Sequence, residues 1–383
     1  MRNFWKSAAK AERKPDVGTM GQWDLIVLRF RRHRLASLSL ALLGGLYFIA
    51  AFAGFFSTSD PFEKDTRFLF APPAFPSFSL SRGFYVHPMV RHADPVTQRS
   101  YYTLDESKIL PLGFFVKGYP YRLAGLFPST THFFGVDASR YEALNGVPPT
   151  GELPRFLLLG GDKFGRDIFS RVLYGARISL SIGLVAIVIS FVLGVSVGGI
   201  SGYFGGRIDN LIQRVIEIIN AFPKLPLWLA LGAALPRSWS NMEVYLGITV
   251  ILSLMGWTGM ARVVRGKILA LREEDYAVAA RLLGASHTRV LFRHLVPGFT
   301  SHIIVSLTLT VPGMILGETA LSFLGIGLQA PTISWGVMLQ DCMSMQVVKS
   351  YPWLLLPVGS IILSVMCFNF VGDGLRDAAD PYS

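Results

Sequence analysis

The sequence predicts an all-α polytopic membrane protein with six transmembrane helices and a long extracytoplasmic insertion between helices 1 and 2. Its composition is 51% hydrophobic and only 16% charged, whereas charged residues make up about 25% of a typical soluble protein. Apolar runs long enough to cross about 30 Å of hydrocarbon recur along the chain, and a helix is the open-chain structure that satisfies every backbone group in lipid. Basic residues are also unevenly distributed among the segments between these runs, which predicts the orientation of the chain in the membrane.

Six apolar runs define the expected spans. They are Leu35–Phe56, Ile178–Gly199 and, with approximate ends, Ile212–Leu235, Val244–Val264, Ser301–Leu324 and Trp353–Val371. Pro223 and Pro226 interrupt the third run, and we expect a kink or break there because proline removes a helix donor and clashes with the preceding turn. Spans 2 to 6 make a membrane core over residues 175–372.

The basic residues place the N-terminus in the cytoplasm. Residues 1–34 carry nine Lys or Arg against three acids, and residues 262–293, which alternation of the spans also places inside, carry seven against three. Residues 57–174 fall outside with thirteen basic and eleven acidic residues, and the tail 373–383 falls inside. The net charge of +11 therefore indicates orientation and affinity for anionic lipid headgroups, and no nucleic-acid partner is expected.

The insertion over residues 57–174 is rich in proline and aromatic residues. Alternating patches such as RFLF and SYYTL are compatible with short strands or hairpins, and the segment is long enough for a small domain. A largely irregular flap packed on the membrane core is the equally weighted alternative.

The sequence offers little that points to catalysis or metal binding. It contains no G-x-x-x-x-G-K-[ST] phosphate loop, no H-E-x-x-H and no C-x-x-C, and its seven histidines are scattered. The fragment Gly325–Ala330 loosely imitates a dinucleotide fingerprint but runs into Pro331. Cys342 and Cys367 are too few for a metal site and are not expected to form a disulfide. We therefore expect a non-catalytic chain without a cofactor or metal of its own.

The segment 265–298, expected in the cytoplasm, separates the fourth and fifth apolar runs. Within it lies a polar, basic stretch, Asp275–Pro297. Its pattern predicts two short amphipathic helices hinged at Gly284, where glycine permits a sharp turn or a close approach. A small-residue face of this kind fits a groove in a partner protein, and an interfacial helix on the lipid surface is the alternative. The candidate contact residues are Tyr276, Ala279, Ala280, Leu283, Gly284, Ala285, Arg289, Arg293, His294 and Pro297.

This stretch resembles the EAA loop of bacterial ABC importer permeases, in which E-A-A, Gly and I-x-L-P follow at fixed spacing. The matching residues are Val278-Ala279-Ala280, Gly284 and His294-Leu295-Val296-Pro297. Val278, His294 and Val296 depart from the general pattern in the manner of the dipeptide, oligopeptide and nickel branch.

Three further segments resemble the second permease subunit of that branch. They are residues 161–179 (GDKFGRD…SRVLYGARIS), residues 317–336 (GETALSFLGIG…P…SWG) and residues 372–381 (GDGLRDAADP). The likeness covers residues 158–383 closely and 1–56 loosely. The part of the insertion from about residue 60 to 155 is longer than usual and is not explained by it.

The resemblance implies a permease of the type I ABC importer kind in the bacterial cytoplasmic membrane, with both termini cytoplasmic. Such a subunit pairs with a second permease subunit around one path, with two ATPase subunits below that bind ATP and Mg and an extracytoplasmic binding protein above. Residues 279–297 would form the coupling helix. Peptides are the expected cargo, and nickel chelates or other small solutes are the alternatives.

Charged residues near the outer face are candidates for the path. Glu318 and Trp335, together with Asp162, Arg166 and Asp167, could line it, but structural pairing of Glu318 is favoured because an acid facing lipid is costly. Asp162, Arg166, Asp167 and Arg177 could also form one ionic cluster, with a role in fixing the loop favoured. Asp373, Arg376 and Asp377 are interpreted as a helix cap and inter-subunit clamp.

Three expectations remain open at this point. The glycines from Gly194 to Gly198 favour packing within the chain over a subunit contact. The insertion is hypothesised to cap the path or to receive the binding protein. A stand-alone secondary transporter would show embedded acids or inverted repeats, and a membrane-anchored sensor would leave the Gly284 segment without a role.

Overall fold

The computed structural model describes residues 21–93, 95, 100–146 and 155–380. The basic residues of the segment 1–20 and Pro381 of the C-terminal motif lie outside the described residues. Within that part, five helices are long and apolar enough to cross a membrane, and a bent pair brings the number to six if it counts as one span. The structure thus confirms a mostly helical polytopic protein with a long insertion after the first span.

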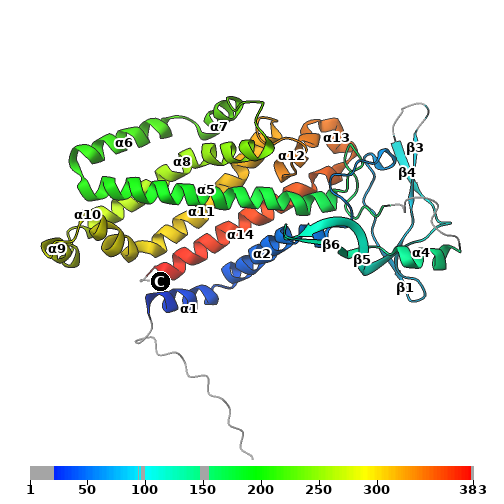
Figure 1. Ribbon diagram of the computed structural model, residues 1–383, viewed down its shortest axis with the longest axis horizontal. Helices are drawn as coiled ribbons and strands as arrows, with labels where there is room; N and C mark the ends of the chain where they lie inside the picture. Colours follow the sequence, from blue (N-terminus) through cyan, green and yellow to red (C-terminus); the bar gives the residue numbers. More distant parts are fainter. Residues whose placement is uncertain (1–20, 94, 96–99, 147–154, 381–383) are drawn as a thin grey trace, which may run out of the picture.

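The membrane bundle lies along the long axis of the molecule, with the C-terminal end, α1 and α9 at one end and the insertion at the other (Figure 1). Its helices are α1 (Gln22–Arg32), α2 (Arg34–Ala51), α3 (Ala53–Phe56), α5 (Ile168–Phe204), α6 (Gly206–Ala221), α7 (Lys224–Ala233), α8 (Asn241–Leu271), α9 (Asp275–Leu282), α10 (His287–Arg289), α11 (Thr300–Phe323) and α14 (Leu356–Ala379). Short helical pieces join α11 to α14, namely α12 (Trp335–Leu339), η5 (Gln340–Met343), α13 (Met345–Ser350) and η6 (Pro352–Leu355).

Several helices extend beyond their apolar runs. Helix α5 begins at Ile168, ten residues before the expected start of the second span at Ile178. Asp167 starts this helix because its carboxylate accepts hydrogen bonds from the amides of Phe169 and Ser170, as an N-cap residue does. Hydropathy marks only the part of a helix that crosses hydrocarbon, which explains why polar extensions escape it.

The third span is broken, as its prolines predicted. Helix α6 ends at Ala221, α7 begins at Lys224, and the two axes are bent by 85°. Pro223 stands at the start of α7, where its missing amide costs no helical hydrogen bond.

Glycines let α5 and α8 pack with their backbones nearly in contact. A Cβ atom on Gly198 would lie 2.4 Å from the carbonyl oxygen of Ala261, and one on Gly194 would lie 2.4 Å from Cγ of Met260. A Cβ on Gly202 would lie 2.8 Å from the carbonyl oxygen of Arg265. The packing of these glycines within the chain is therefore confirmed.

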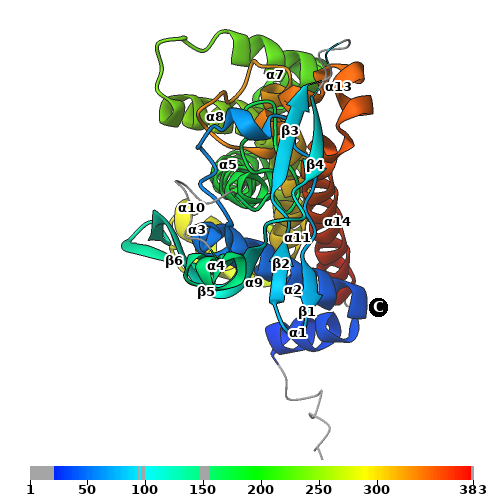
Figure 2. The same ribbon diagram turned by 90° about the vertical axis from the view of Figure 1, so that its right-hand side faces the viewer.

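The insertion contains a small antiparallel sheet, so the strand interpretation holds and the irregular flap is wrong. The strands are β1 (Ser77–Ser79), β2 (Gly83–Val86), β3 (Met89–Ala93), β4 (Ser100–Leu104), β5 (Leu110–Leu123) and β6 (Phe127–Val136). Four of them form a sheet in the order β1-β2-β5-β6, while β3 pairs with β4 alone. Figure 2 looks onto these strands, with the helical bundle behind them. One turn, η2 (Thr66–Phe68), precedes the sheet and one helix, α4 (Ala138–Asn145), follows it.

The sheet is fixed to the end of the bundle opposite α9. The rings of Phe55 and Phe56 in α3 lie 5.9 and 5.7 Å from the ring of Phe133 in β6. The segment before the sheet pairs with the segment after it through backbone hydrogen bonds. The amide of Phe70 donates to the carbonyl oxygen of Asp162, and the amide of Ala74 donates to that of Leu157.

Candidate functional site

Helix α9 projects from the end of the bundle that also carries α1 and the C-terminal end (Figure 1). Its base is fixed by Ala277, which is fully buried in a hydrophobic cluster with Val290 and Leu295. Nη2 of Arg281 also donates to the carbonyl oxygen of Arg272 at 2.8 Å. The short helix is therefore held as a fixed projection on the ends of the longer ones.

Gly284 ends α9 in a left-handed turn. Its φ is +84°, and the amides of Gly284 and Ala285 donate to the carbonyl oxygens of Arg281 and Ala280, the pattern of a Schellman motif. A Cβ atom at Gly284 would meet nothing within 4 Å. Glycine is thus required by the backbone conformation and not by a close approach.

Two adjacent leucines form the tip of this projection. Leu282 is 82% exposed and Leu283 is 88% exposed. Such exposure of large apolar side chains at a helix end is typical of a contact surface for a partner. The predicted contact residues included Leu283 but not Leu282. The pair of leucines directly before a glycine C-cap is a sequence pattern that could have indicated both.

The other candidate contact residues are brought to the same end of the molecule but differ in exposure. Those with exposed side chains are Tyr276, Ala279, Arg289, Arg293 and Pro297, while Ala280, Ala285 and His294 are half-buried.

The second amphipathic helix expected after Gly284 is not a separate element, which corrects the prediction. From His287 the chain runs without a break into the fifth span, through α10, a π-helical turn η3 (Val290–Leu295) and a 3₁₀ turn η4 (Val296–Phe299). Pro297 lacks an amide hydrogen, so regular α-helical hydrogen bonding cannot continue through it, and the irregular turns adjoin it.

Polar contacts connect the base of α9 to α5, α6 and α8. Nη1 of Arg272, which follows α8, donates to the carbonyl oxygens of Gly202 and Tyr203 at 3.1 and 3.3 Å. The carboxylate of Asp209 in α6 accepts two hydrogen bonds of 2.6 Å from Arg265 in α8. These contacts tie the ends of α5, α6 and α8 together beside the base of α9.

Glu318, proposed from sequence as a path residue, is fully buried among three serine hydroxyls. Its Oε1 accepts hydrogen bonds from Ser322 and Ser334 at 2.9 and 2.8 Å, and its Oε2 accepts one from Ser179 at 3.1 Å. Trp335 is also fully buried, and its amide donates to the same Ser179. Glu318 is thus paired with polar groups, as the sequence favoured, and neither side chain reaches a surface of this chain. A place of either residue on the path stays a prediction.

The four charged residues near the start of α5 do not form one cluster, which corrects that alternative. Asp162 pairs with Arg166 at 2.6 Å and lies 3.6 Å from Nε of Arg171, a partner that the sequence reading did not assign. Arg177 lies elsewhere, with its Nε donating to the carbonyl oxygen of Ala50 at 2.7 Å.

Asp167 joins the start of α5 to the end of the first span. Its Oδ2 accepts a hydrogen bond of 2.8 Å from Thr58, and Ser170 accepts hydrogen bonds from the amides of Thr58 and Ser59 at 3.1 Å. Burial raises the pKa of the Asp167 carboxyl. Because Asp162, Arg166 and Asp167 are all buried, their contacts agree with the loop-fixing role.

The C-terminal acids lie in the last turns of α14 and face α1 of the same chain. His33 lies 3.9 Å from Asp377, and Nη1 of Arg29 donates to the carbonyl oxygen of Asp380 at 2.5 Å. The clamp between subunits stays a prediction for Asp373, Arg376 and Asp377.

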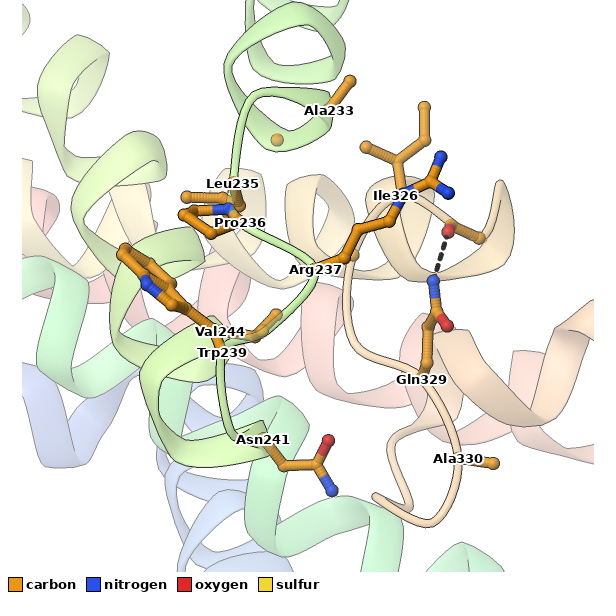
Figure 3. Close-up of a pocket in the computed structure, with 13 residues that line it drawn as sticks. Ala233, Leu235, Pro236, Arg237, Trp239, Asn241, Val244, Ile326, Gln329 and Ala330 are labelled. Atoms are coloured by element: carbon orange, nitrogen blue, oxygen red, sulfur yellow. Dashed lines mark hydrogen bonds between the residues drawn. The ribbon is translucent and has the colours of Figure 1, made fainter.

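An open hollow of about 470 Å³ lies at the end of the bundle opposite α9. It is lined by the loop after α7, with Arg237 and Trp239, and by the loop after α11, with Ile326 and Gln329 (Figure 3). Nε2 of Gln329 donates to the carbonyl oxygen of Gly325 at 2.8 Å. The fragment Gly325–Ala330 thus forms part of the wall of this hollow.

Comparison with known proteins identifies the family. Residues 190–382 match the model of the binding-protein-dependent transport system inner membrane component, and residues 21–73 match that of the N-terminal transmembrane domain of oligopeptide transport permease C. The oligopeptide transport system permease protein OppC of Bacillus subtilis (strain 168) is 42% identical over 65% of this chain and 78% of its own length.

Two further relatives agree. The dipeptide transport system permease protein DppC of the same organism is 38% identical over 74% of this chain and 85% of its own length. The glutathione transport system permease protein GsiD of Pectobacterium atrosepticum is 37% identical over 63% and 76%. Among solved structures, a chain of the inward-facing MetNI methionine ABC transporter covers 54% of this chain and 96% of its own, with a TM-score of 0.44 and 15% identity.

The two family models and the curated relatives confirm the resemblance found in the sequence and exclude the stand-alone transporter and the sensor. A subunit of this kind is a non-catalytic, multi-pass inner-membrane permease that works with ATPase and binding-protein partners. The chain belongs to the family of binding-protein-dependent transport system inner membrane components, as the permease of an ABC importer of the oligopeptide and dipeptide group.

Proposed function

We propose that this permease forms one half of a path for importing di- or oligopeptides. The other half is a second permease subunit, two cytoplasmic ATPase subunits bind ATP and Mg, and an extracytoplasmic binding protein delivers the cargo. The names of its relatives, which specify oligopeptide, dipeptide and glutathione transport, support a peptide cargo. The chain itself carries no cofactor in this proposal, and lipids surround its bundle.

The orientation in the proposal places both termini and α9 in the cytoplasm. The basic residues of the N-terminal segment support it. So does the position of α1, α9 and the C-terminal end, which lie together at the end of the bundle opposite the insertion (Figure 1).

The observation that carries the coupling role is the exposed Leu282–Leu283 tip on a fixed base. An interfacial helix would present an apolar stripe to lipid along its length, whereas α9 buries Ala277 against the protein and exposes its leucines at one end. Seated in a cleft of an ATPase subunit, the tip would move when ATP closes the ATPase pair. The contacts of Arg272 and Arg281 would pass that movement to the span ends, which shifts the population of two states of the bundle.

Replacing Gly284 tests this coupling role. We expect Gly284→Val to reduce ATP-driven uptake of trialanine in proteoliposomes by about tenfold or more, because a β-branched residue at positive φ is strained and displaces the leucine tip. Gly284→Asn is the matched control, since asparagine tolerates the left-handed conformation. The complex should be purified from its native membrane, with the partners measured at stoichiometric amounts.

The proposal is contradicted if the wild-type chain purifies without a second permease and ATPase subunits. It is also contradicted if Gly284→Val and Gly284→Asn are indistinguishable in uptake. Uptake of a nickel chelate instead of trialanine would correct the cargo but keep the architecture.

The insertion is proposed to cap the path or to receive the binding protein at the entry side. Residues 65–74 are interlocked with residues 157–164, so a deletion should spare both and replace residues 77–146 with a short glycine-serine linker. We expect the shortened chain to assemble with its partners but to lose most binding-protein docking, measured by pull-down of the loaded binding protein. Unchanged docking and uptake would contradict this role.

A further inference from the structure

A cavity of about 380 Å³ lies beside the break in the third span. It is bounded by the end of α6, the start of α7 and the middle parts of α8 and α11, and its polar lining consists of Asn220, Lys224, Trp228, Thr258, Arg262 and Thr310. Arg262 follows Ala261, which packs on Gly198 six residues before the end of α5. At 1.5 Å per residue, the cavity therefore lies about 9 Å inside the α9 end of the bundle.

Two of the lining side chains are cations. Lys224 and Arg262 are both exposed on the cavity wall, and neither forms an ion pair or hydrogen bond with another residue in the described part of the chain. A cation that faces the hydrocarbon at the centre of a membrane helix costs on the order of 3 kcal/mol or more. This wall is therefore suited to water or to an anion and not to lipid chains.

The acids on the four lining helices are all engaged elsewhere. Asp209 binds Arg265 with both oxygens, and Glu217 pairs with Arg214 at 2.8 Å. Glu318 is enclosed by its serines away from the cavity.

The fourth acid, Glu243, accepts a hydrogen bond from the amide of Ser240 at the outer end of α8. Lys267, five residues after Arg262 in α8, adds a further cation on the side toward α9, with its Nζ 3.1 Å from Nε2 of His302. No carboxylate of these helices therefore neutralises the cavity.

The backbone adds to this positive field. Helix α7 starts at the break without a side-chain cap, so its first free amides, including that of Lys224, and the positive end of its dipole lie beside the cavity. Gly259 in α8 and Gly313 in α11 also line it, and a Cβ atom at either would meet nothing within 4 Å. The cavity therefore has unfilled room next to its cations.

We propose that this cavity is a transient binding site for a carboxylate group of the transported cargo, held by Lys224 and Arg262. A guanidinium presents a planar pair of donors that matches a carboxylate, and a lysine ammonium adds a second charge. The cargo of this importer is accordingly a solute with at least one free carboxylate, such as a peptide with an unblocked C-terminus. This carboxylate site rests on the proposed importer function in one respect, namely that the translocation path runs along this wall.

A charge-selective labelling experiment tests the site without reference to any cargo. In the complete complex, Cys342 and Cys367 are replaced by serine and Thr310→Cys places a thiol on the cavity wall. The thiol is reacted with a negatively charged sulfonatoethyl methanethiosulfonate and with its positively charged trimethylammonioethyl counterpart. We expect the anionic-to-cationic rate ratio to fall about tenfold when Lys224→Gln and Arg262→Gln are combined, because charged clefts concentrate counter-ions by that factor or more.

Arg214→Gln is the control, because Arg214 is an exposed cation of α6 that pairs with Glu217 outside the cavity. It should leave the ratio unchanged. A ratio that does not respond to the double substitution overturns the proposal. Failure of both reagents also overturns it, because the wall would then be covered by lipid or by a neighbouring protein.

Uptake of a peptide acid and its amide gives the second test. Proteoliposomes with the wild-type binding protein are supplied with trialanine or trialanine amide, so that the preference of the binding protein is the same for every variant. Arg262→Gln is expected to lower the acid-to-amide uptake ratio by about tenfold, as loss of a charge-assisted hydrogen bond does.

An equal loss for both peptides would show a structural role for Arg262 and overturn the proposal. If the wild-type complex transports neither peptide, the peptide cargo fails. The labelling ratio still decides whether the cation site exists in that case, so the two failures are distinguishable.

Discussion

Replacing Leu282 and Leu283 together with aspartate is expected to abolish ATP-driven uptake and to release the ATPase subunits from the complex. Both side chains are more than four-fifths exposed, so the substitution should not disturb the fold of this chain. Burial of one leucine in an interface contributes about 1.5 to 3 kcal/mol, and an unpaired aspartate in the same place adds a desolvation cost. We expect the affinity for the ATPase subunit to fall more than 100-fold, measured by co-purification and by uptake in proteoliposomes.

The matched control is Leu80→Asp, which makes the same chemical change at a leucine that is 97% exposed on the insertion. It should leave the ATPase subunits bound. If the double aspartate variant retains its ATPase subunits and its uptake, the coupling role of α9 is wrong. A decrease in the thermal stability of the detergent-solubilised chain would instead assign the leucines to the fold, and circular dichroism with heating separates these results.

Replacing Gly198 with valine is expected to destabilise the membrane bundle severely. The new Cβ atom alone would lie 2.4 Å from a backbone carbonyl oxygen of α8, and a helix backbone cannot move away as a flexible side chain can. Overpacking of a core costs about 1 to 3 kcal/mol, and we expect the upper part of that range or more here. The measurement is the fraction of monodisperse protein that survives heating in detergent, followed by size-exclusion chromatography.

Gly44→Val provides the control, because Gly44 is a helical glycine in the first span and a Cβ atom there would meet nothing within 4 Å. Both variants carry the same change in helix propensity, so their difference reports the contact between α5 and α8. Equal stability of the two variants would contradict the close packing. Loss of the partner permease without loss of stability would reassign Gly198 to a subunit contact.

The sequence determined the class of the protein, its spans and the position of the polar segment around Gly284 between two of them. Hydrophobic runs suffice for this because each membrane helix must satisfy its own backbone and length requirements locally. The break in the third span at Pro223 and the left-handed turn at Gly284 were also predictable, since proline and glycine act on the backbone at their own positions.

The tertiary structure decided which residues share a surface. The burial of Glu318 among serines from three segments and the exposure of Leu282 depend on how distant segments pack, and no local pattern records that. The sequence could not separate Arg177 from Asp162 and Arg166, because neighbours along the chain point to different partners in space.

The cavity with Lys224 and Arg262 shows the same limit. These residues are 38 positions apart, with Lys224 in the middle of the third apolar run and Arg262 near the end of the fourth. Only the fold places them on one wall while directing the acids of the same helices to other partners, because charge pairing depends on distances of a few ångströms that sequence spacing does not fix.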